Sequence, residues 1–338
     1  MADEDFGRAG RRATKGGGGR ASRASEGRAP EAGGGRAPKA DPGLYGPDSV
    51  TWQLHGDPMM WIAGVRALYL QALHPRAVRG VLQNSDFRRD AWGRLMRTAG
   101  FVGTTTYGTT EAAERAGAAV RGIHRRLTAT DPATGERYPV DEPALLLWVH
   151  CAEIDSYLEV VRRSGHPASA ALRGAAGDAY IRENRTAARL VGLDPAAVPG
   201  DRARLAAYFE EVRPELAATP EAAAVDDFLR RPPAPLPLLP VRDLLWRRVA
   251  SLAYAALPPY AHALYGRPAP PPDTVDRRLR AAGRVLRSVP ATVRWQLPPK
   301  HILRAVARLG PGTRPSAYKL CRPAAILRAH GAQGEPQD

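Results

Sequence analysis

The chain has little cysteine, few aromatic residues and no long apolar run. Its 338 residues include two cysteines, Cys151 and Cys321, which exclude a disulfide framework and a thiolate zinc site. No CxxCH motif is present, so a covalently attached c-type haem is excluded. No apolar stretch approaches the ~20 residues that span a bilayer. The cysteine usage is typical of a reducing compartment, and we expect a cytoplasmic protein without a transmembrane segment.

The sequence also lacks the marks of a nucleic-acid-binding protein, although its net charge is +15. Such a charge suits nucleic acid or an anionic membrane. There is no zinc-finger spacing, no RNP-like aromatic motif and no basic helix of the nucleic-acid-binding kind, and the arginines are scattered near acids. We therefore expect a solvated basic surface and no nucleic-acid partner. A weak contact with a membrane surface stays open.

Composition divides the chain into three parts. Residues 1–42 are rich in Gly, Ala, Arg and Ser without periodicity, which predicts a disordered basic tail. The Arg11-Arg12 pair in it has no hydrophobic stretch after it, so we do not expect an export signal. Residues 45–325 carry helical periodicity, and residues 326–338 are expected to form a second disordered tail. Ala and Leu dominate over Ile, Thr and Phe, which predicts an all-α fold, a single globular helical domain.

Capping residues and breaks locate the helices. An apolar helix from Met59 should end at His74, which precedes a proline and is expected to cap or pack. Thr110 and Asp141 are the expected N-caps of the two helices that follow the Thr-rich run. Between those helices "TDPATGERYPV" is expected to be a connector, and no strand of useful length is expected. Further helices are predicted at about 172–191, 201–214, 220–230, 241–256, 273–287 and 299–308.

Two of the eight histidines lie on helix faces that should point inward. His124 lies on an apolar stripe with Ala113, Gly117, Val120 and Leu127, and His150 shares a face with Leu146, Ile154 and Tyr157. A buried imidazole needs partners for its ring nitrogens. A hydrogen-bonded core histidine is the usual case for a single residue of this kind. Gly117 and Gly122 would let a flat ligand approach the helix of His124.

A haem suits these residues better than a bare metal ion. A zinc or non-haem iron site needs three or four ligands, and Glu153 near His150 supplies too few. Haem needs one neutral imidazole, an apolar slot and arginines for its propionates. The segment "GRLMRTAGFVGTTTYGT" provides Arg94 and Arg97, and then a Gly/Thr-rich run with a turn expected over Gly103–Gly108. A solvated helix face with ion pairs, for example to Asp90, is the alternative for these arginines.

Four motifs in a fixed order resemble one family. They are "LHPRAVRGVLQNSDF", "RLMRTAGFVGTTTYGT", "VRGIHRRL" and "GERYPVDEPALLLWVH". In this order they resemble the latex-clearing rubber oxygenases and the MpaB-type oxygenases, over about residues 50–260. The resemblance implies an all-helical protein with a globin-like core that binds haem b and activates dioxygen to oxidise an apolar small molecule. It leaves the electron donor unidentified.

The resemblance also implies roles for particular residues. His124 matches the proximal iron ligand, and His150 is a rival cofactor-binding residue for which we prefer a structural role, with a hydrogen bond to Asp155 or a backbone carbonyl. Arg94 and Thr98 match the arginine and threonine of an Arg-x-x-Lys-Thr motif, and Arg97 stands at its lysine position. We expect all three on the distal, catalytic side of the haem, with Tyr107 packed near the pocket.

Arg97 departs from the family pattern, because the rubber oxygenases carry lysine at this position. Lysine can lose its proton and ligate iron, whereas arginine stays protonated. We therefore do not expect a side-chain amine on the iron, and a polymeric substrate is in doubt. The alternative function is a non-catalytic helical protein that binds haem or a hydrophobic ligand.

Overall fold

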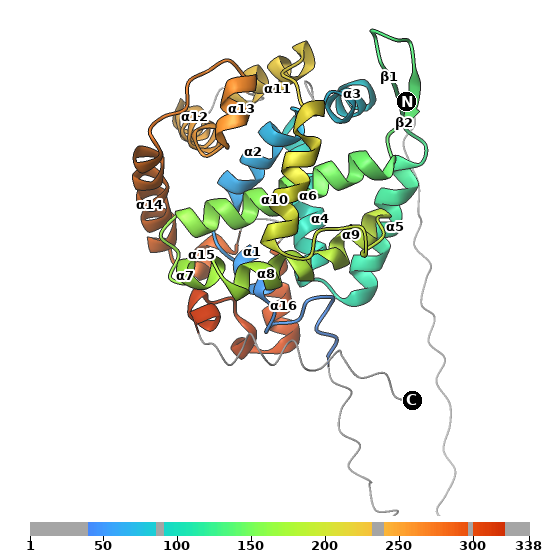
Figure 1. Ribbon diagram of the computed structural model, residues 1–338. Helices are drawn as coiled ribbons and strands as arrows, with labels where there is room; N and C mark the ends of the chain where they lie inside the picture. Colours follow the sequence, from blue (N-terminus) through green and yellow to red (C-terminus); the bar gives the residue numbers. More distant parts are fainter. Residues whose placement is uncertain (1–39, 86–90, 232–239, 297–299, 322–338) are drawn as a thin grey trace, which may run out of the picture. The chain divides into compact units, whose positions relative to one another are not determined.

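The computed structural model describes residues 40–85, 91–231, 240–296 and 300–321 (Figure 1). The two predicted tails lie outside the described residues, apart from residues 40–42. The described residues belong to one compact unit and are almost entirely helical, which confirms the predicted all-α single domain. None of the helices in this part of the chain is long and apolar enough to cross a membrane. The expected globin-like core stays a prediction.

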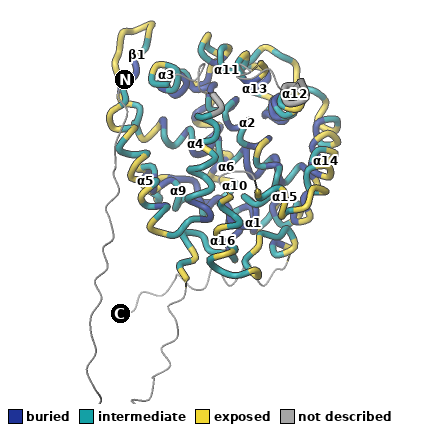
Figure 2. Tube along the Cα trace, turned by 180° about the vertical axis from the view of Figure 1, so that it is seen from behind, coloured by how far each residue is buried: buried dark blue, intermediate teal, exposed yellow. Residues whose placement is uncertain are grey.

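Helices α2 (Met60–Gln71) and α6 (Pro143–Arg163) form the centre of the fold and make its most extensive helix contact. Buried residues gather along them in Figure 2, and side chains such as Trp148 are fully buried. One ion pair, between Arg66 and Asp155, joins the two helices. Arg66 of α2 donates to the Asp155 carboxylate at 2.8 Å and to the Ser156 hydroxyl at 2.7 Å. Because a buried charge without a partner is costly, this pairing fixes how α2 and α6 face each other.

The remaining helices surround this pair. The predicted helix over 220–230 is confirmed to the residue, with Thr219 as its N-cap and Pro220 in its first turn. The helix predicted over 172–191 is instead two helices that meet at Asn184, whose side chain donates to the Thr51 hydroxyl. The elements are α1 (Val50–His55), α3 (Pro75–Asn84), α7 (Ser169–Leu172), α8 (Ala175–Glu183), α9 (Arg185–Val191), α10 (Arg202–Val212), α11 (Pro220–Arg230), α12 (Pro240–Ala255), α13 (Pro259–Leu264), α14 (Pro272–Ser288), α15 (Ala291–Arg294) and α16 (His301–Leu309).

Helix α4 (Ala91–Tyr107) is longer than predicted, because it continues through the Gly/Thr-rich run. The turn expected over Gly103–Gly108 is therefore wrong, and the chain leaves the helix only after Tyr107. The Thr105 and Thr106 hydroxyls donate back to the Val102 carbonyl at 3.0 and 2.8 Å, which satisfies them inside the helix.

Helix α5 (Thr110–His124) follows α4 and packs against both α4 and α9. Its N-cap is Thr109, one residue before the predicted cap, and the Thr109 hydroxyl accepts from Ala112 N. The N-cap of α6 is Glu142 rather than Asp141, with Pro143 at the first helical position. Each cap differs from its predicted position by one residue, and the Glu142 side chain makes no capping hydrogen bond.

A small hairpin replaces the expected connector between α5 and α6. Strand β1 (Thr128–Thr130) pairs antiparallel with β2 (Arg137–Pro139), and Ala129 lies opposite Tyr138. Both of these side chains are buried, whereas their neighbours on β2 are exposed. Gly135 takes a φ of +72° in the turn between the strands. Each strand has three residues, which is too short for an alternating pattern to be recognised in the sequence.

Candidate functional site

His124 is the last residue of α5 and is half-buried. Its Nδ1 atom is buried and makes no hydrogen bond to any described residue. Burial lowers the pKa of His124, Asp141 raises this pKa, and Arg94 lowers it. The imidazole is therefore neutral at pH 7 and keeps one nitrogen lone pair available.

Arg94 of α4 acts electrostatically on His124, because its charge lowers the pKa of the His124 ring. Its expected role on the distal side of a haem stays a prediction. The Arg94 guanidinium is half-buried and donates to the Ser85 hydroxyl at the end of α3. Burial lowers the pKa of Arg94, and the Arg97 charge lowers it further, yet an arginine stays protonated at neutral pH. We call His124, Arg94, Ser85 and Asp141 the His124 site.

Arg97 and Thr98 lie one turn further along α4, and both are exposed. The Thr98 hydroxyl donates to the Arg94 carbonyl at 3.2 Å, so it is occupied within its own helix. Asp90, the acid considered as an ion-pair partner, lies outside the described residues. Of the three residues expected on the distal side, Arg94 is the one whose charge acts on His124, and the distal role of all three stays a prediction.

His150 lies inside the fold, as predicted from its place on α6. Burial lowers the pKa of His150 to about 4, and its Nε2 atom makes no hydrogen bond within the described residues. The suggested hydrogen bond between His150 and Asp155 is absent, and the Asp155 carboxylate accepts from Arg66. The five-residue step between them puts Asp155 on another side of the helix.

Tyr107 is buried, and its contacts tie three helices together. Its hydroxyl donates to the Trp52 carbonyl at 2.9 Å, and its ring meets the Trp52 ring edge-on at 4.8 Å. Arg308 of α16 donates to the Tyr107 carbonyl at 2.9 Å. The hydroxyl of Tyr107 is thus already bonded to the backbone of α1.

The two glycines expected to leave room beside His124 differ in their surroundings. A Cβ on Gly117 would lie 2.8 Å from the Leu190 carbonyl oxygen, so this glycine permits the close packing of α5 on α9. A Cβ on Gly122 would meet no atom within 4 Å. The expectation that Gly117 admits a flat ligand is therefore wrong.

A second polar cluster adjoins the C-terminal half of α4, and the sequence did not predict it. His55 Nδ1 lies 2.8 Å from the Thr106 hydroxyl, and His55 Nε2 lies 3.1 Å from the Tyr180 hydroxyl. The Thr106 hydroxyl donates its proton to the Val102 carbonyl and can therefore only accept from His55. His55 thus donates through Nδ1 to Thr106 and accepts through Nε2 from the Tyr180 hydroxyl. Burial lowers the pKa of His55 to about 3, so this ring is neutral.

Glu153 and Tyr157 of α6 complete this cluster. The Tyr157 ring meets the His55 ring edge-on at 5.4 Å, and the Tyr157 hydroxyl acts to lower the pKa of the Glu153 carboxylate. Burial raises the pKa of Glu153 to about 7. We call His55, Thr106, Glu153, Tyr157 and Tyr180 the His55 cluster. The steps of three and four from His150 to Glu153 and Tyr157 were the available sequence signal, because they place three polar side chains on one face of an apolar helix.

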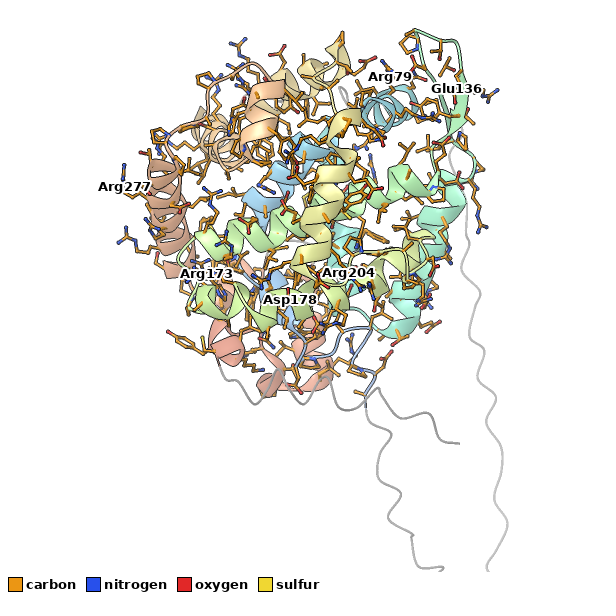
Figure 3. The ribbon with its side chains drawn as sticks, in the orientation of Figure 1. Arg79, Glu136, Arg173, Asp178, Arg204 and Arg277 are labelled. Carbon is orange, nitrogen blue, oxygen red and sulfur yellow. The ribbon has the colours of Figure 1, made fainter. Side chains whose placement is uncertain are left out.

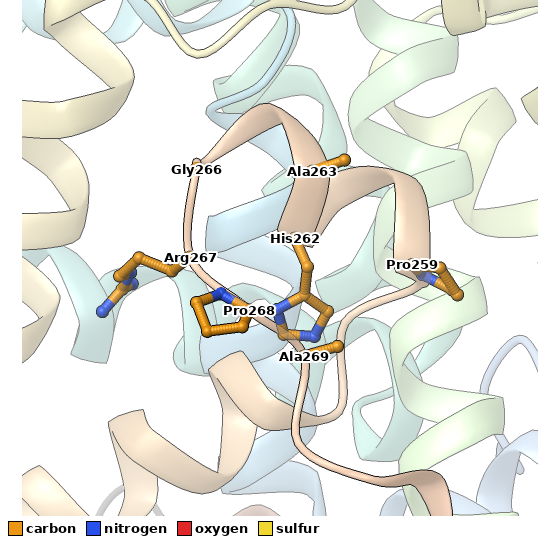
Figure 4. A pocket seen from close by; sticks show the side chains of 7 residues that line it. All are labelled: Pro259, His262, Ala263, Gly266, Arg267, Pro268 and Ala269. Carbon is orange, nitrogen blue, oxygen red and sulfur yellow. The ribbon is translucent and has the colours of Figure 1, made fainter.

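A surface hollow of about 320 Å³ lies apart from both groups, beside α13 (Figure 4). His262 lines the hollow, is 3% exposed and makes no hydrogen bond. Burial lowers the pKa of His262, and the nearby backbone of Ala255 and Leu257 partly offsets this effect. Arg267 pairs with Asp226 at 2.6 Å and stacks on the Tyr254 ring, so its charge is already matched. The described residues contain no group of three or more His, Cys, Asp or Glu side chains placed to hold a metal ion.

These observations define a helical protein with a neutral histidine and an arginine brought together by α4 and α5. The family model described as ER-bound oxygenase mpaB/B'/Rubber oxygenase, catalytic domain, matches residues 52–288. This match covers more than half of the chain, so the protein belongs to this family of oxygenase catalytic domains and the resemblance seen in the motifs is confirmed. Comparisons with curated proteins and with solved structures found no match.

Proposed function

We propose that this protein is a haem b-dependent oxygenase that uses dioxygen to oxidise an apolar small molecule. The observation that carries the proposal is the buried, unpartnered Nδ1 atom of His124 in a neutral ring beside Arg94. Haem iron needs a neutral imidazole, and a haem propionate needs a cation. The family match adds the oxygenase chemistry.

His124 would ligate the haem iron, and bound haem would supply the chemistry of dioxygen activation. The fixed charge of Arg94 helps to keep the His124 ring unprotonated and therefore able to ligate. The Ser85 hydroxyl accepts from Arg94 and so restricts the orientation of the guanidinium. The remaining N–H groups of Arg94 can then donate to a carboxylate or to a substrate oxygen.

His150 is the second candidate ligand, since its Nε2 atom is also buried and unpartnered. We favour His124 because it has a neighbouring guanidinium, whereas burial is the cause of the lowered pKa of His150. Arg97 and Thr98 are exposed, whereas Arg94 is half-buried, so we favour Arg94 as the residue that would contact the haem or substrate.

The test is the visible absorption spectrum of the purified protein, oxidised and then reduced, followed by titration with haemin. We expect a Soret band with b-type features. His124→Ala should abolish haem loading, because the axial ligand is lost. His262→Ala is the matched control, since it also removes a buried imidazole without hydrogen bonds, and it should load haem normally. Thermal unfolding of each variant checks that it is folded.

Three outcomes separate the alternatives. Full haem occupancy in His124→Ala together with loss in His150→Ala would transfer the axial role to His150. A folded, colourless protein that takes up no haemin would overturn the haem proposal. Haem binding without dioxygen consumption across a set of apolar substrates would identify a carrier or sensor instead of an oxygenase.

A further inference from the structure

Helix α14 has an inner face that is anchored to the rest of the described fold. Val275 and Leu279 are buried, and Gly283 lies against the Ser164 carbonyl with no room for a Cβ. Two ion pairs reinforce this contact: Arg163–Asp276 at 2.7 Å and Arg287–Asp57 at 2.7 Å. The inner charges of α14 are therefore matched, and the orientation of the helix is fixed.

The outer face of α14 carries arginines without such partners. Arg278, Arg280 and Arg284 are exposed and make no ion pair or hydrogen bond with any described residue, while Arg277 donates to the Thr274 hydroxyl at 2.8 Å. Figure 3 shows Arg277 pointing outward from α14. These four side chains line a shallow hollow of about 580 Å³. Because arginine stays protonated, the hollow is cationic at any physiological pH.

Exposed valines continue this face beyond the arginines. Val285 is 67% exposed, Val289 is 38% exposed, and Val293 of α15 is 58% exposed. Single exposed valines are ordinary on protein surfaces. Here Val285 follows Arg284 directly, and Val289 lies one turn later, so apolar and cationic side chains share one end of the helix.

We propose that this face of α14 and α15 binds the surface of an anionic phospholipid membrane. The arginines would contact lipid phosphates, and the valines would enter the boundary between headgroups and acyl chains. Nucleic acid offers phosphates too, but it would gain little from exposed valines. The proposal uses none of the residues of the His124 site, so it stands independently of the proposed function.

The test is sedimentation of the full chain with phosphatidylcholine vesicles, with and without phosphatidylserine. The triple variant R278A/R280A/R284A should weaken binding to the anionic vesicles by more than about ten-fold. R125A/R126A/R304A is the matched control, because it removes three exposed arginines elsewhere and changes the net charge equally. It should weaken binding by less than about three-fold. Residues 1–39 are unchanged throughout, so their own arginines contribute equally to every sample.

Substitution of the valines distinguishes binding to a lipid surface from binding to other phosphate-bearing ligands. V285S/V289S/V293S should reduce binding to anionic vesicles, and the loss should persist at high salt, where charge attraction is screened. Equal vesicle binding by the arginine variant and its control would overturn the proposal. A second outcome would reassign the face to nucleic acid. In this outcome R278A/R280A/R284A weakens the binding of a DNA or RNA oligonucleotide, and V285S/V289S/V293S leaves vesicle binding unchanged.

Discussion

The two halves of helix α4 differ in how their polar groups are satisfied. In the N-terminal half, Arg94 approaches an imidazole with an unpartnered nitrogen, and Arg97 and Thr98 face solvent. In the C-terminal half, Thr105 and Thr106 are buried and bonded within the helix. A satisfied cluster stabilises a fold, whereas a buried atom without a partner costs free energy and suggests a ligand. One helix thus carries a structural region and a candidate site.

The largest expected effect concerns Glu153 in the His55 cluster. Its pKa is about 7 in the folded state against 4.5 for an ordinary glutamate. Between these values the folded state holds a proton that the unfolded state has released, so Glu153 lowers stability as pH rises, by up to ~1.4 kcal/mol per pH unit. Glu153→Gln removes this loss and can still accept from Tyr157.

The measurement is urea unfolding of Glu153→Gln and the natural protein at several pH values between 4.5 and 8. The free energy of unfolding of the variant, minus that of the natural protein, should rise from pH 4.5 to about 7 and then level off. A difference that stays constant over this range would show that Glu153 is ionised in the folded state.

A pair of identical substitutions compares the two halves of α4 directly. Thr106→Val leaves the Nδ1–H group of His55 without an acceptor, which should cost about 1–3 kcal/mol of unfolding free energy. Thr98→Val removes a hydroxyl that is likewise bonded to its own helix, but it is exposed, so the change should stay within about 0.5 kcal/mol. Urea unfolding measures both. Equal losses would contradict the distinction between the two halves.

The smallest effect sharpens the role of Arg94. Its charge lowers the pKa of His124, so Arg94→Met should raise that pKa. Arg97→Met removes a charge one turn away that acts on Arg94 rather than directly on His124, and it should change the pKa of His124 less. NMR titration of the His124 ring, assigned with a His124→Ala variant, measures the shift. A larger shift for Arg97→Met would exchange the two roles.

The sequence predicted what depends on local pattern. The helix over 220–230 has its cap and proline in adjacent positions, and the structure reproduces it. His74 was expected to cap or pack at the end of the helix from Met59, and it is the N-cap of the next helix, α3, where its Nδ1 atom accepts from Ala77 N. The turn expected within α4 failed because glycine and threonine disfavour a helix only until tertiary contacts compensate for them. Here His301 of α16 lies directly against Gly103, where a side chain would not fit.

The site was predicted less completely, because its contacts are long-range. Motif order indicated Arg94 and His124, and the Arg94 charge does act on the His124 ring, while their roles at a haem stay predictions. His55 reaches Thr106 across 51 residues and Tyr180 across 125, and no periodicity in one segment reveals such contacts. Glu153 was considered only as a metal ligand, because its spacing to Tyr157 shows a shared helix face but not the burial that raises its pKa.

Helix α16 has a practical consequence for how this oxygenase domain is produced. The family match ends at residue 288, yet α16 supplies Arg308, which donates to the carbonyls of Tyr107 and Gly108 at the end of α4. Beyond it, the Thr313 carbonyl accepts from the Trp52 indole at 2.9 Å. A protein truncated at the family boundary would expose Trp52 and leave the last carbonyls of α4 without these donors. An expression boundary placed after residue 321 retains every one of these contacts.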